Sequence, residues 1–188
     1  MNINERMNLK GMHNINNIMF VFAVCNILNL DYGKAINSIK NFKTLEHRME
    51  YVGIFNEIEF YNDSIATIPE ATINSIETIK NVNTLIVGGK DRGINLDYFI
   101  KYLEKSKIKN IICLPKTGKY IKRQLKDCKK NIYYTESLED AVNIASDVTE
   151  KNKVCLLSPA ASSYGYFKNF EERGNLFKKY VSEYSKSK

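Results

Sequence analysis

Residues 157–175 read LSPAASSYGYFKNFEERGN, and this stretch says most about the fold. An apolar run from Val154 to Leu157 leads into it, small residues fill 158–163, and a segment with helical character follows. The order of buried strand, Ser/Ala loop and helix start is the one in which α/β domains present backbone N–H groups and hydroxyls to an anion. The stretch therefore predicts an anion-binding loop at the end of a buried strand.

The chain after residue 45 repeats this alternation of short apolar segments with amphipathic ones. Strands are predicted for residues 84–87, 110–114, 132–134 and 153–157. Helices are predicted for residues 69–80, 95–105, 119–126, 137–149 and 167–184. Before them, Tyr51 to Tyr61 predicts one or two strands broken near Asn56. Short apolar strands separated by helices indicate an α/β, Rossmann-like, doubly wound and mainly parallel sheet of five or six strands, with helices on both faces.

Residues 1–44 have a different, helical pattern. We expect Asn14 to cap a helix that continues through Cys25, and a second helix to carry Ile39 on its apolar face. Two short helices with wide apolar faces must pack against something, either the rest of this chain or a domain that is absent. The prediction is thus a short helical appendage followed by the main domain at 45–188.

The composition is that of an ordinary globular protein, since 44% of the 188 residues are hydrophobic and 26% are charged. The formal charge of +7 raises the question of nucleic acid, but the lysines are spread along the chain, so we expect no nucleic-acid partner. The four cysteines form no Cys-x-x-Cys pair, which argues against a disulfide framework or a zinc site. The apolar run 18–28 is too short to span a bilayer, so we expect no membrane insertion and a cytoplasmic location.

Three loops of unusual composition follow predicted strands, at residues 62–67, 88–93 and 158–163. In doubly wound sheets, ligands bind outside the carboxyl ends of the strands, near a switch in strand order. We therefore expect these three loops to converge on one edge of the sheet and to form the binding site.

Five motifs in the chain resemble those of the Mur ligases. Residues 157–174 resemble the C-terminal pattern LSPACASFDxFKNFExRG, and residues 62–72 resemble NDSKATNPxAT. Residues 88–93 resemble GGxDKG, residues 45–50 resemble LPHRxE, and residues 11–17 resemble GxHNxxN. The motifs occur in the family's order, and the glutamate-adding members of the family match best.

By this resemblance, the three loops bind glutamate. Thr67 would lie at the glutamate site, Arg92 would grip a carboxylate with two parallel N–H bonds, and Ser163 would hydrogen-bond the side-chain carboxylate. Tyr164 and Phe170 would wall the same pocket. The residues alone also allow plainer interpretations: a solvated glycine turn around Arg92, and ordinary helix packing of Phe170.

The resemblance also implies an ATP site. Arg48 would reach toward the γ-phosphate and is the expected catalytic residue, because a guanidinium spreads charge as a phosphoryl group transfers. Asp63 would contact the ribose, while Asn14 and Asn17 would contact adenine. His47 is a candidate hinge residue.

The implied activity is an ATP-dependent ligation in peptidoglycan precursor synthesis, the pathway that supports cell shape and division. The carboxylate of UDP-N-acetylmuramoyl-L-alanine would be activated as an acyl phosphate, and the amine of D-glutamate would then displace phosphate. ATP and Mg²⁺ would serve the complete enzyme. This chain has no GxxxxGK[ST] loop. We expect no metal ligands in it and no ligase activity from it alone, with residues 1–44 being a remnant of a central ATPase domain.

Other interpretations stay open at this point. Ile65 replaces the lysine of NDSKAT, which leaves Lys90 or Arg92 to supply that cation and raises L-glutamate as the alternative substrate. A naturally short, non-catalytic module that binds glutamate or nucleotide is a second alternative, and a basic nucleic-acid-binding α/β protein is a third. Exposed helix faces in 1–44 would also allow a dimer.

Overall fold

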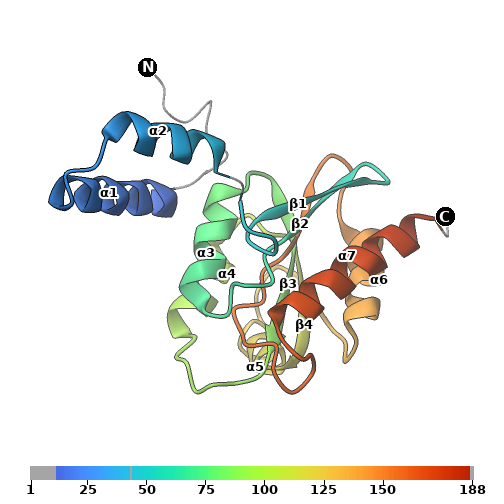
Figure 1. Cartoon of the computed structure of the whole chain (residues 1–188). Coiled ribbons are helices and arrows are strands. Elements are labelled where there is room, and N and C mark those ends of the chain that lie inside the picture. Colours follow the sequence, from blue (N-terminus) through green and yellow to red (C-terminus); the bar gives the residue numbers. More distant parts are fainter. Residues whose placement is uncertain (1–11, 43, 187–188) are drawn as a thin grey trace. The chain divides into compact units, whose positions relative to one another are not determined.

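The computed structural model describes residues 12–42 and 44–186, apart from the side chains of residues 12 and 13. The chain divides into two compact units, Met1–Leu45 and Glu46–Lys188, and each is described by itself. This division falls one residue after the boundary expected at 44/45. Figure 1 shows the helices of the first unit in blue and the α/β second unit in green to red.

The first unit holds two helices, α1 (Met12–Ile27) and α2 (Tyr32–Asn41). Asp31 is the N-cap of α2, and its side chain accepts a hydrogen bond from the Lys34 backbone N–H at 2.8 Å. The expectation that Asn14 caps α1 is wrong, because α1 begins at Met12 and Asn14 lies inside its first turn. Its amide oxygen instead accepts a hydrogen bond from the Asn17 side chain.

The second unit is built on one six-stranded sheet with the order β1-β2-β6-β3-β4-β5. The strands are β1 (Glu50–Phe55), β2 (Ile58–Asn62), β3 (Val82–Gly89), β4 (Asn110–Lys116), β5 (Asn131–Tyr134) and β6 (Val154–Leu157). All neighbouring pairs are parallel except β1 with β2. The predicted fold class is therefore confirmed.

The break predicted near Asn56 is the turn of the hairpin β1–β2. Asn56 and Glu57 both have positive φ, 50° and 65°. Two consecutive left-handed residues are what a tight two-residue hairpin turn requires, and asparagine adopts this conformation at low cost.

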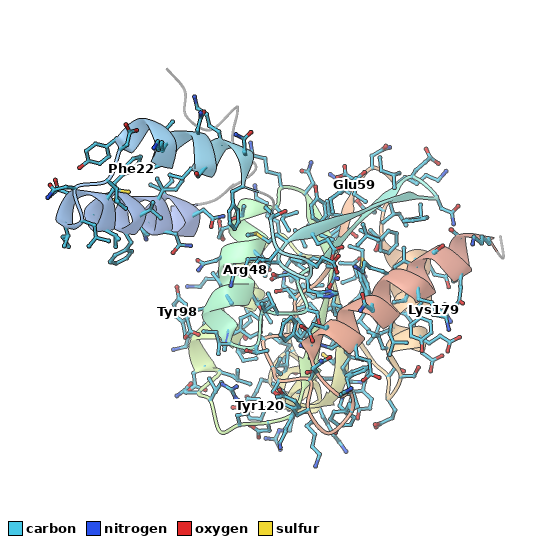
Figure 2. The ribbon with its side chains drawn as sticks, in the orientation of Figure 1. Phe22, Arg48, Glu59, Tyr98, Tyr120 and Lys179 are labelled. Atoms are coloured by element: carbon cyan, nitrogen blue, oxygen red, sulfur yellow. The ribbon has the colours of Figure 1, made fainter. Side chains whose placement is uncertain are left out.

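Helices cover both faces of the sheet, as expected. One face carries α3 (Pro69–Thr78), α4 (Asp97–Lys105) and α5 (Thr117–Gln124); the other carries α6 (Leu138–Val148) and α7 (Phe170–Lys186). The buried strand β3 serves both layers, because Leu85 and Val87 pack with the first set of helices while Ile86 packs with the second. Side chains fill the space between sheet and helices (Figure 2).

The order of the strands creates the switch at which such folds bind ligands. From β3 the chain steps outward to β4 and β5, and α6 then returns it, on the other face, to β6 between β2 and β3. The neighbouring strands β2, β6 and β3 are parallel, so their carboxyl ends lie at one edge.

Candidate amino-acid and nucleotide site

Three loops leave the carboxyl ends of these neighbouring strands: the β2 loop (62–68), the β3 loop (88–96) and the β6 loop (158–169). Backbone hydrogen bonds join them. Asp63 N–H donates to the Leu157 carbonyl at 2.8 Å, and Lys90 N–H donates to the Ser162 carbonyl at 2.8 Å. The predicted convergence of the three loops is thus present in the structure.

The β3 loop passes so close to the β6 loop that only glycine fits at position 89. A Cβ on Gly89 would lie 2.3 Å from the Ser162 carbonyl oxygen, and the residue has a φ of +149°. Both the contact and the backbone conformation exclude a side chain. The Gly-Gly pair at the end of β3 therefore keeps the two loops in contact.

Asp63 sits at the centre of this junction and is only 2% exposed. Its Oδ2 accepts hydrogen bonds from the hydroxyls of Ser75 at 2.6 Å and Ser158 at 2.7 Å, and its Oδ1 accepts one from Met49 N–H at 3.2 Å. Burial raises the pKa of Asp63 above its usual value, although these hydrogen bonds and the charge of Arg48 oppose the shift. These bonds join the end of β2 to α3, to the end of β6 and to the segment before β1, and because Asp63 is buried a ligand can reach the carboxylate only if this junction opens.

A buried polar cluster lies where the second unit begins. The His47 ring is 3% exposed, and the Asn62 amide donates to its Nδ1 at 2.8 Å and to Glu50 Oε2 at 2.9 Å. Lys178 on α7 donates to Glu50 Oε1 at 2.9 Å. Burial and the charge of Lys178 lower the pKa of His47 despite the nearby carboxylates. The ring is therefore held neutral between β2 and α7.

This cluster fixes the backbone on both sides of Arg48. His47 and Met49 have φ values of 62° and 44°, a conformation that non-glycine residues adopt rarely. His47 N–H donates to the Glu50 carboxylate, and Met49 N–H donates to Asp63. The Arg48 side chain is left exposed at the start of the second unit (Figure 2).

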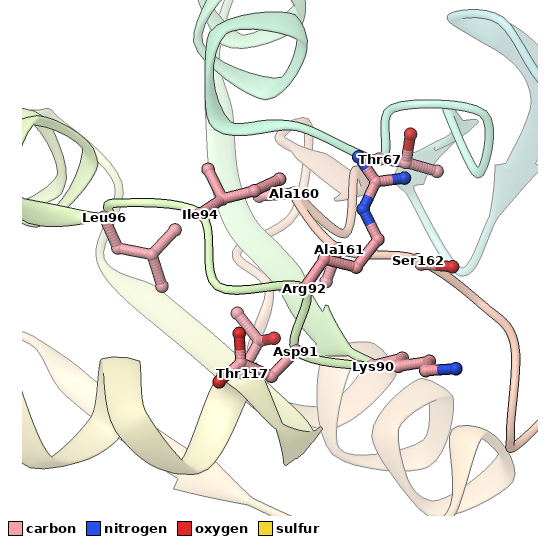
Figure 3. Close-up of a pocket in the computed structure, with 10 residues that line it drawn as sticks. All are labelled: Thr67, Lys90, Asp91, Arg92, Ile94, Leu96, Thr117, Ala160, Ala161 and Ser162. Carbon is pink, nitrogen blue, oxygen red and sulfur yellow. The ribbon is translucent and has the colours of Figure 1, made fainter.

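A shallow hollow, open to solvent, lies at the edge where the loops converge (Figure 3). It is lined by Thr67, Lys90, Asp91, Arg92, Ile94, Leu96, Thr117, Ala160, Ala161 and Ser162. The Arg92 guanidinium extends toward Thr67 across the hollow. The lining carries two cations, one carboxylate (Asp91) and three hydroxyl side chains, so its charge is positive on balance, which suits a ligand with a carboxylate.

The structure brings together some of the residues expected to bind glutamate, but not all of them. Thr67 and Arg92 line the hollow. Ser163 is 2% exposed beside it, and its hydroxyl makes no hydrogen bond within 12–42 and 44–186. Tyr164 is 59% exposed and lies outside the lining, as does Phe170, whose ring packs edge-on against His47.

Sequence reasoning left three polar residues of this lining without a role. Asp91 precedes Arg92, and its carboxylate accepts the Gly93 N–H at 2.8 Å, which shapes the β3 loop. Ser162 lies beside the predicted Ser163, and only the backbone geometry of the β6 loop decides which one faces the hollow. Thr117 comes from the end of β4, and no local pattern in the sequence connects it with the other loops.

The remaining predicted residues lie elsewhere. Asn14 and Asn17 belong to α1 in the first unit, so the structure does not assign them a place at this hollow. Within the part of the chain that the structure describes, no three His, Cys, Asp or Glu side chains gather closely enough to hold a metal ion. In the same part, no helix is both long and apolar enough to cross a membrane.

These features define a Rossmann-like α/β domain with a candidate site at a strand-order switch. The family model for the Mur ligase glutamate ligase domain matches residues 47–161. The chain belongs to the Mur ligase family.

Individual relatives agree with this assignment. The UDP-N-acetylmuramoylalanine--D-glutamate ligase of Caldanaerobacter subterraneus subsp. tengcongensis is 37% identical over 182 residues, which is 95% of this chain and 40% of that protein. The enzyme of the same name from Aquifex aeolicus is 35% identical over 94% of this chain and 42% of its own length. The chain thus spans about two fifths of the curated relatives that it matches.

Solved structures share the fold. The UDP-N-acetylmuramate-alanine ligase of Thermotoga maritima superposes with a TM-score of 0.70 at 22% identity, over 97% of this chain and 40% of that chain. A pseudomurein peptide ligase type C from Methanothermus fervidus gives 0.71 at 16% identity, over 94% and 37%. At these identities the likeness concerns the fold alone.

Proposed function

We propose that this chain is the amino-acid-binding C-terminal part of an ATP-dependent ligase that adds D-glutamate to UDP-N-acetylmuramoyl-L-alanine. Its relatives at 35–37% identity carry the name of that enzyme. The proposal places the reaction in the cytoplasm, where ATP and UDP-linked precursors are made. The observation that carries it is the hollow at the strand switch, with Arg92 and Lys90 beside Thr67.

In this proposal Arg92 holds a glutamate carboxylate. The guanidinium is exposed on the β3 loop and faces Thr67, so it is free to form two parallel hydrogen bonds with an incoming carboxylate. Thr67 supplies a further donor from the lining, while the buried Ser163 hydroxyl, which lies outside the lining, would do so only after the β6 loop rearranges. A fixed carboxylate orients the amine of the amino acid for attack, which is a positioning contribution to catalysis.

Arg48 takes the phosphate role. Its backbone is held by the His47 cluster and by Asp63, while its side chain projects free. Because the Arg48 backbone is fixed and its guanidinium is exposed, the side chain can contact a phosphoryl group during its transfer. Asp63 would reach the ribose only after releasing Ser75 and Ser158, so we infer that nucleotide binding is coupled to movement at this junction.

The first unit supports the view that the activity belongs to a longer protein. Several of its large apolar side chains are exposed, among them Met19 at 64%, Phe20 at 72% and Ile27 at 75%. Helices with this much exposed apolar surface normally pack against other elements of a larger domain. We propose that α1 and α2 complete an ATPase domain, that Asn14 and Asn17 contact adenine there, and that Mg²⁺ is held outside this chain. The chain alone is then inactive.

The first experiment determines the mass of the native protein in its source cells with an antibody raised against this chain. A band well above 21.7 kDa supports the proposal and identifies the protein to assay. A single band at 21.7 kDa contradicts it and favours a short binding module.

The second experiment measures ADP release by the longer protein with UDP-N-acetylmuramoyl-L-alanine and either D- or L-glutamate. We expect dependence on D-glutamate, and in Arg92→Ala a rise in the glutamate KM of about tenfold or more with little change in the UDP-substrate KM. The control is Lys105→Ala, an exposed cation in the last turn of α4. An unchanged glutamate KM in Arg92→Ala overturns the role given to Arg92, and dependence on L-glutamate alone overturns the choice of enantiomer.

A further inference from the structure

Arg173, in the first turn of α7, is completely buried beneath the loops that form the hollow. Burial lowers the pKa of this guanidinium to about 9, and no neighbouring charge contributes to the shift. Among residues 12–42 and 44–186, no carboxylate forms an ion pair with it. A buried cation without a counter-charge is costly, so its hydrogen bonds must be extensive.

Those hydrogen bonds go to two of the three loops. Arg173 Nε donates to the Ser64 hydroxyl at 2.9 Å, and its Nη2 donates to the Ser64 carbonyl at 2.7 Å. Its Nη1 donates to the Ala161 carbonyl at 3.1 Å. The planar fork of a guanidinium can hold two such chains at a fixed separation, whereas the single point charge of a lysine cannot.

The third loop and α7 itself are tied to the same point. The Ser64 hydroxyl in turn donates a hydrogen bond to the Phe170 carbonyl at 2.8 Å. A Cβ on Gly89 would lie 3.2 Å from Arg173 Nη1, so the β3 loop packs directly against the guanidinium. Ala161 also lines the hollow, which places the cation immediately behind its wall.

We propose that Arg173 is a positioning residue for the amino-acid site. It holds Ser64 of the β2 loop at a fixed distance from Ala161 of the β6 loop. Ser64 lies three residues before Thr67, and Ala161 lies two residues before Ser163. The uncompensated charge of Arg173 also favours an anionic ligand in the hollow. The identity of the ligand rests on the proposed function, whereas the effect of Arg173 on the geometry of the loops does not.

The test of the geometry is amide hydrogen exchange in this chain, which needs no ligand. The reporter amides are those of Ala66, which donates within the β2 loop, and Lys90, which donates to the β6 loop, together with Ile65, which donates to the His47 carbonyl. In Arg173→Lys we expect them to exchange about tenfold faster or more, because Lys loses the fork, while amides of α4 and α6 change little. Ser64→Ala, which removes one acceptor and keeps the arginine, should act in the same direction more weakly and covers the case in which Arg173→Lys does not fold.

A matched control is Thr149→Val at the opposite end of the sheet. The Thr149 hydroxyl is buried, donates to the Ala145 carbonyl at 2.6 Å and lies 2.7 Å from the Thr84 hydroxyl, so its loss weakens the domain without touching the loops. If the loop amides of Arg173→Lys and Ser64→Ala exchange at the wild-type rate, the proposal is overturned. It is also overturned if all amides of these variants exchange faster by the same factor, because that is the pattern expected for Thr149→Val, which only lowers the stability of the domain.

Kinetics of the longer protein then link the geometry to the ligand. In Arg173→Lys we expect the glutamate KM to rise about tenfold while the ATP KM stays within about twofold, and Thr149→Val should leave both unchanged. Equal rises in both KM values overturn the positioning role. If the wild-type protein shows no glutamate-dependent ADP release, the proposed function fails, and the exchange experiment still decides the role of Arg173.

Discussion

The hydroxyl of Ser158 donates a 2.7 Å hydrogen bond to Oδ2 of Asp63, which joins the carboxyl end of β6 to that of β2 inside the protein. The two residues lie 95 positions apart in the sequence and are both buried. Ser158 Oγ also lies 3.0 Å from the Thr72 hydroxyl, so this junction reaches α3 as well. The edge that carries the site is therefore held by side chains as well as by the sheet.

Ser158→Ala should lower the free energy of unfolding by about 1–3 kcal/mol, because a buried carboxylate loses one of its donors. Urea denaturation measures the change. Ser146→Ala removes a hydroxyl bonded only to the Val142 carbonyl in its own helix and should cost less than about 1 kcal/mol. Equal losses in the two variants would contradict the importance of the Asp63 junction.

Asp63→Asn should retain the fold and change its pH dependence. Burial raises the pKa of Asp63 in the folded state above the usual 3.8, so the folded protein binds this proton more tightly than the unfolded chain does. The stabilising contribution of protonation is complete below pH 3.8 and is lost as the pH rises through the folded pKa. The difference in unfolding free energy, wild type minus Asp63→Asn, should therefore increase from pH 7 to pH 4. A difference independent of pH would contradict the assigned shift.

His47 should give the opposite pH dependence. Its pKa is lowered below 6.5, so the neutral ring is preferred in the folded state, and the stability it contributes is present above pH 6.5 and lost as the pH falls through the folded pKa. His47→Asn keeps a residue that tolerates the left-handed backbone and removes the titration. The stability of wild type relative to His47→Asn should fall between pH 8 and pH 5. His13 is present in both proteins, so its contribution cancels in the difference between their unfolding free energies. A difference that does not change with pH would show that His47 does not titrate in this range.

Gly174→Ala should be strongly destabilising although alanine favours helices. A Cβ at position 174 would lie 2.3 Å from His47 Nδ1 and 2.9 Å from the Asn62 amide nitrogen, so the buried cluster would have to open. We expect a loss of about 3 kcal/mol or more in thermal or urea unfolding. Asn175→Ala, on the exposed side of the same helix, should change stability by less than about 0.5 kcal/mol. A stable Gly174→Ala protein would mean that the cluster is not tightly packed.

The first unit should cause self-association of the isolated chain. Phe20 and Ile27 are 72% and 75% exposed, and apolar surface of this kind tends to find a partner. Sedimentation at increasing concentration should show association that Phe20→Lys with Ile27→Glu abolishes, with no change in the unfolding temperature of the α/β unit. A wild-type chain that stays monomeric at every concentration would contradict this expectation.

The sequence by itself determined the layered α/β fold and the order of its elements. Strand and helix periodicities differ, and buried parallel strands are apolar without alternation, so the segments 84–87, 110–114 and 153–157 were recognisable as strands. Loop composition likewise indicated which three loops converge at one edge of the sheet. The cap expected at Asn14 failed because an asparagine near a helix start fits a cap and a first turn almost equally well.

Only the tertiary structure decided how the site is assembled. Whether Ser162 or Ser163 faces the hollow depends on the path of the β6 loop, and Thr117 joins the lining because β4 lies beside β3. In the sequence, Arg173 stands among the charged residues of a helix start, where solvent exposure is the usual expectation. It is buried because the fold brings two loops, about a hundred residues apart, to the same guanidinium, and contacts over that distance leave no local pattern.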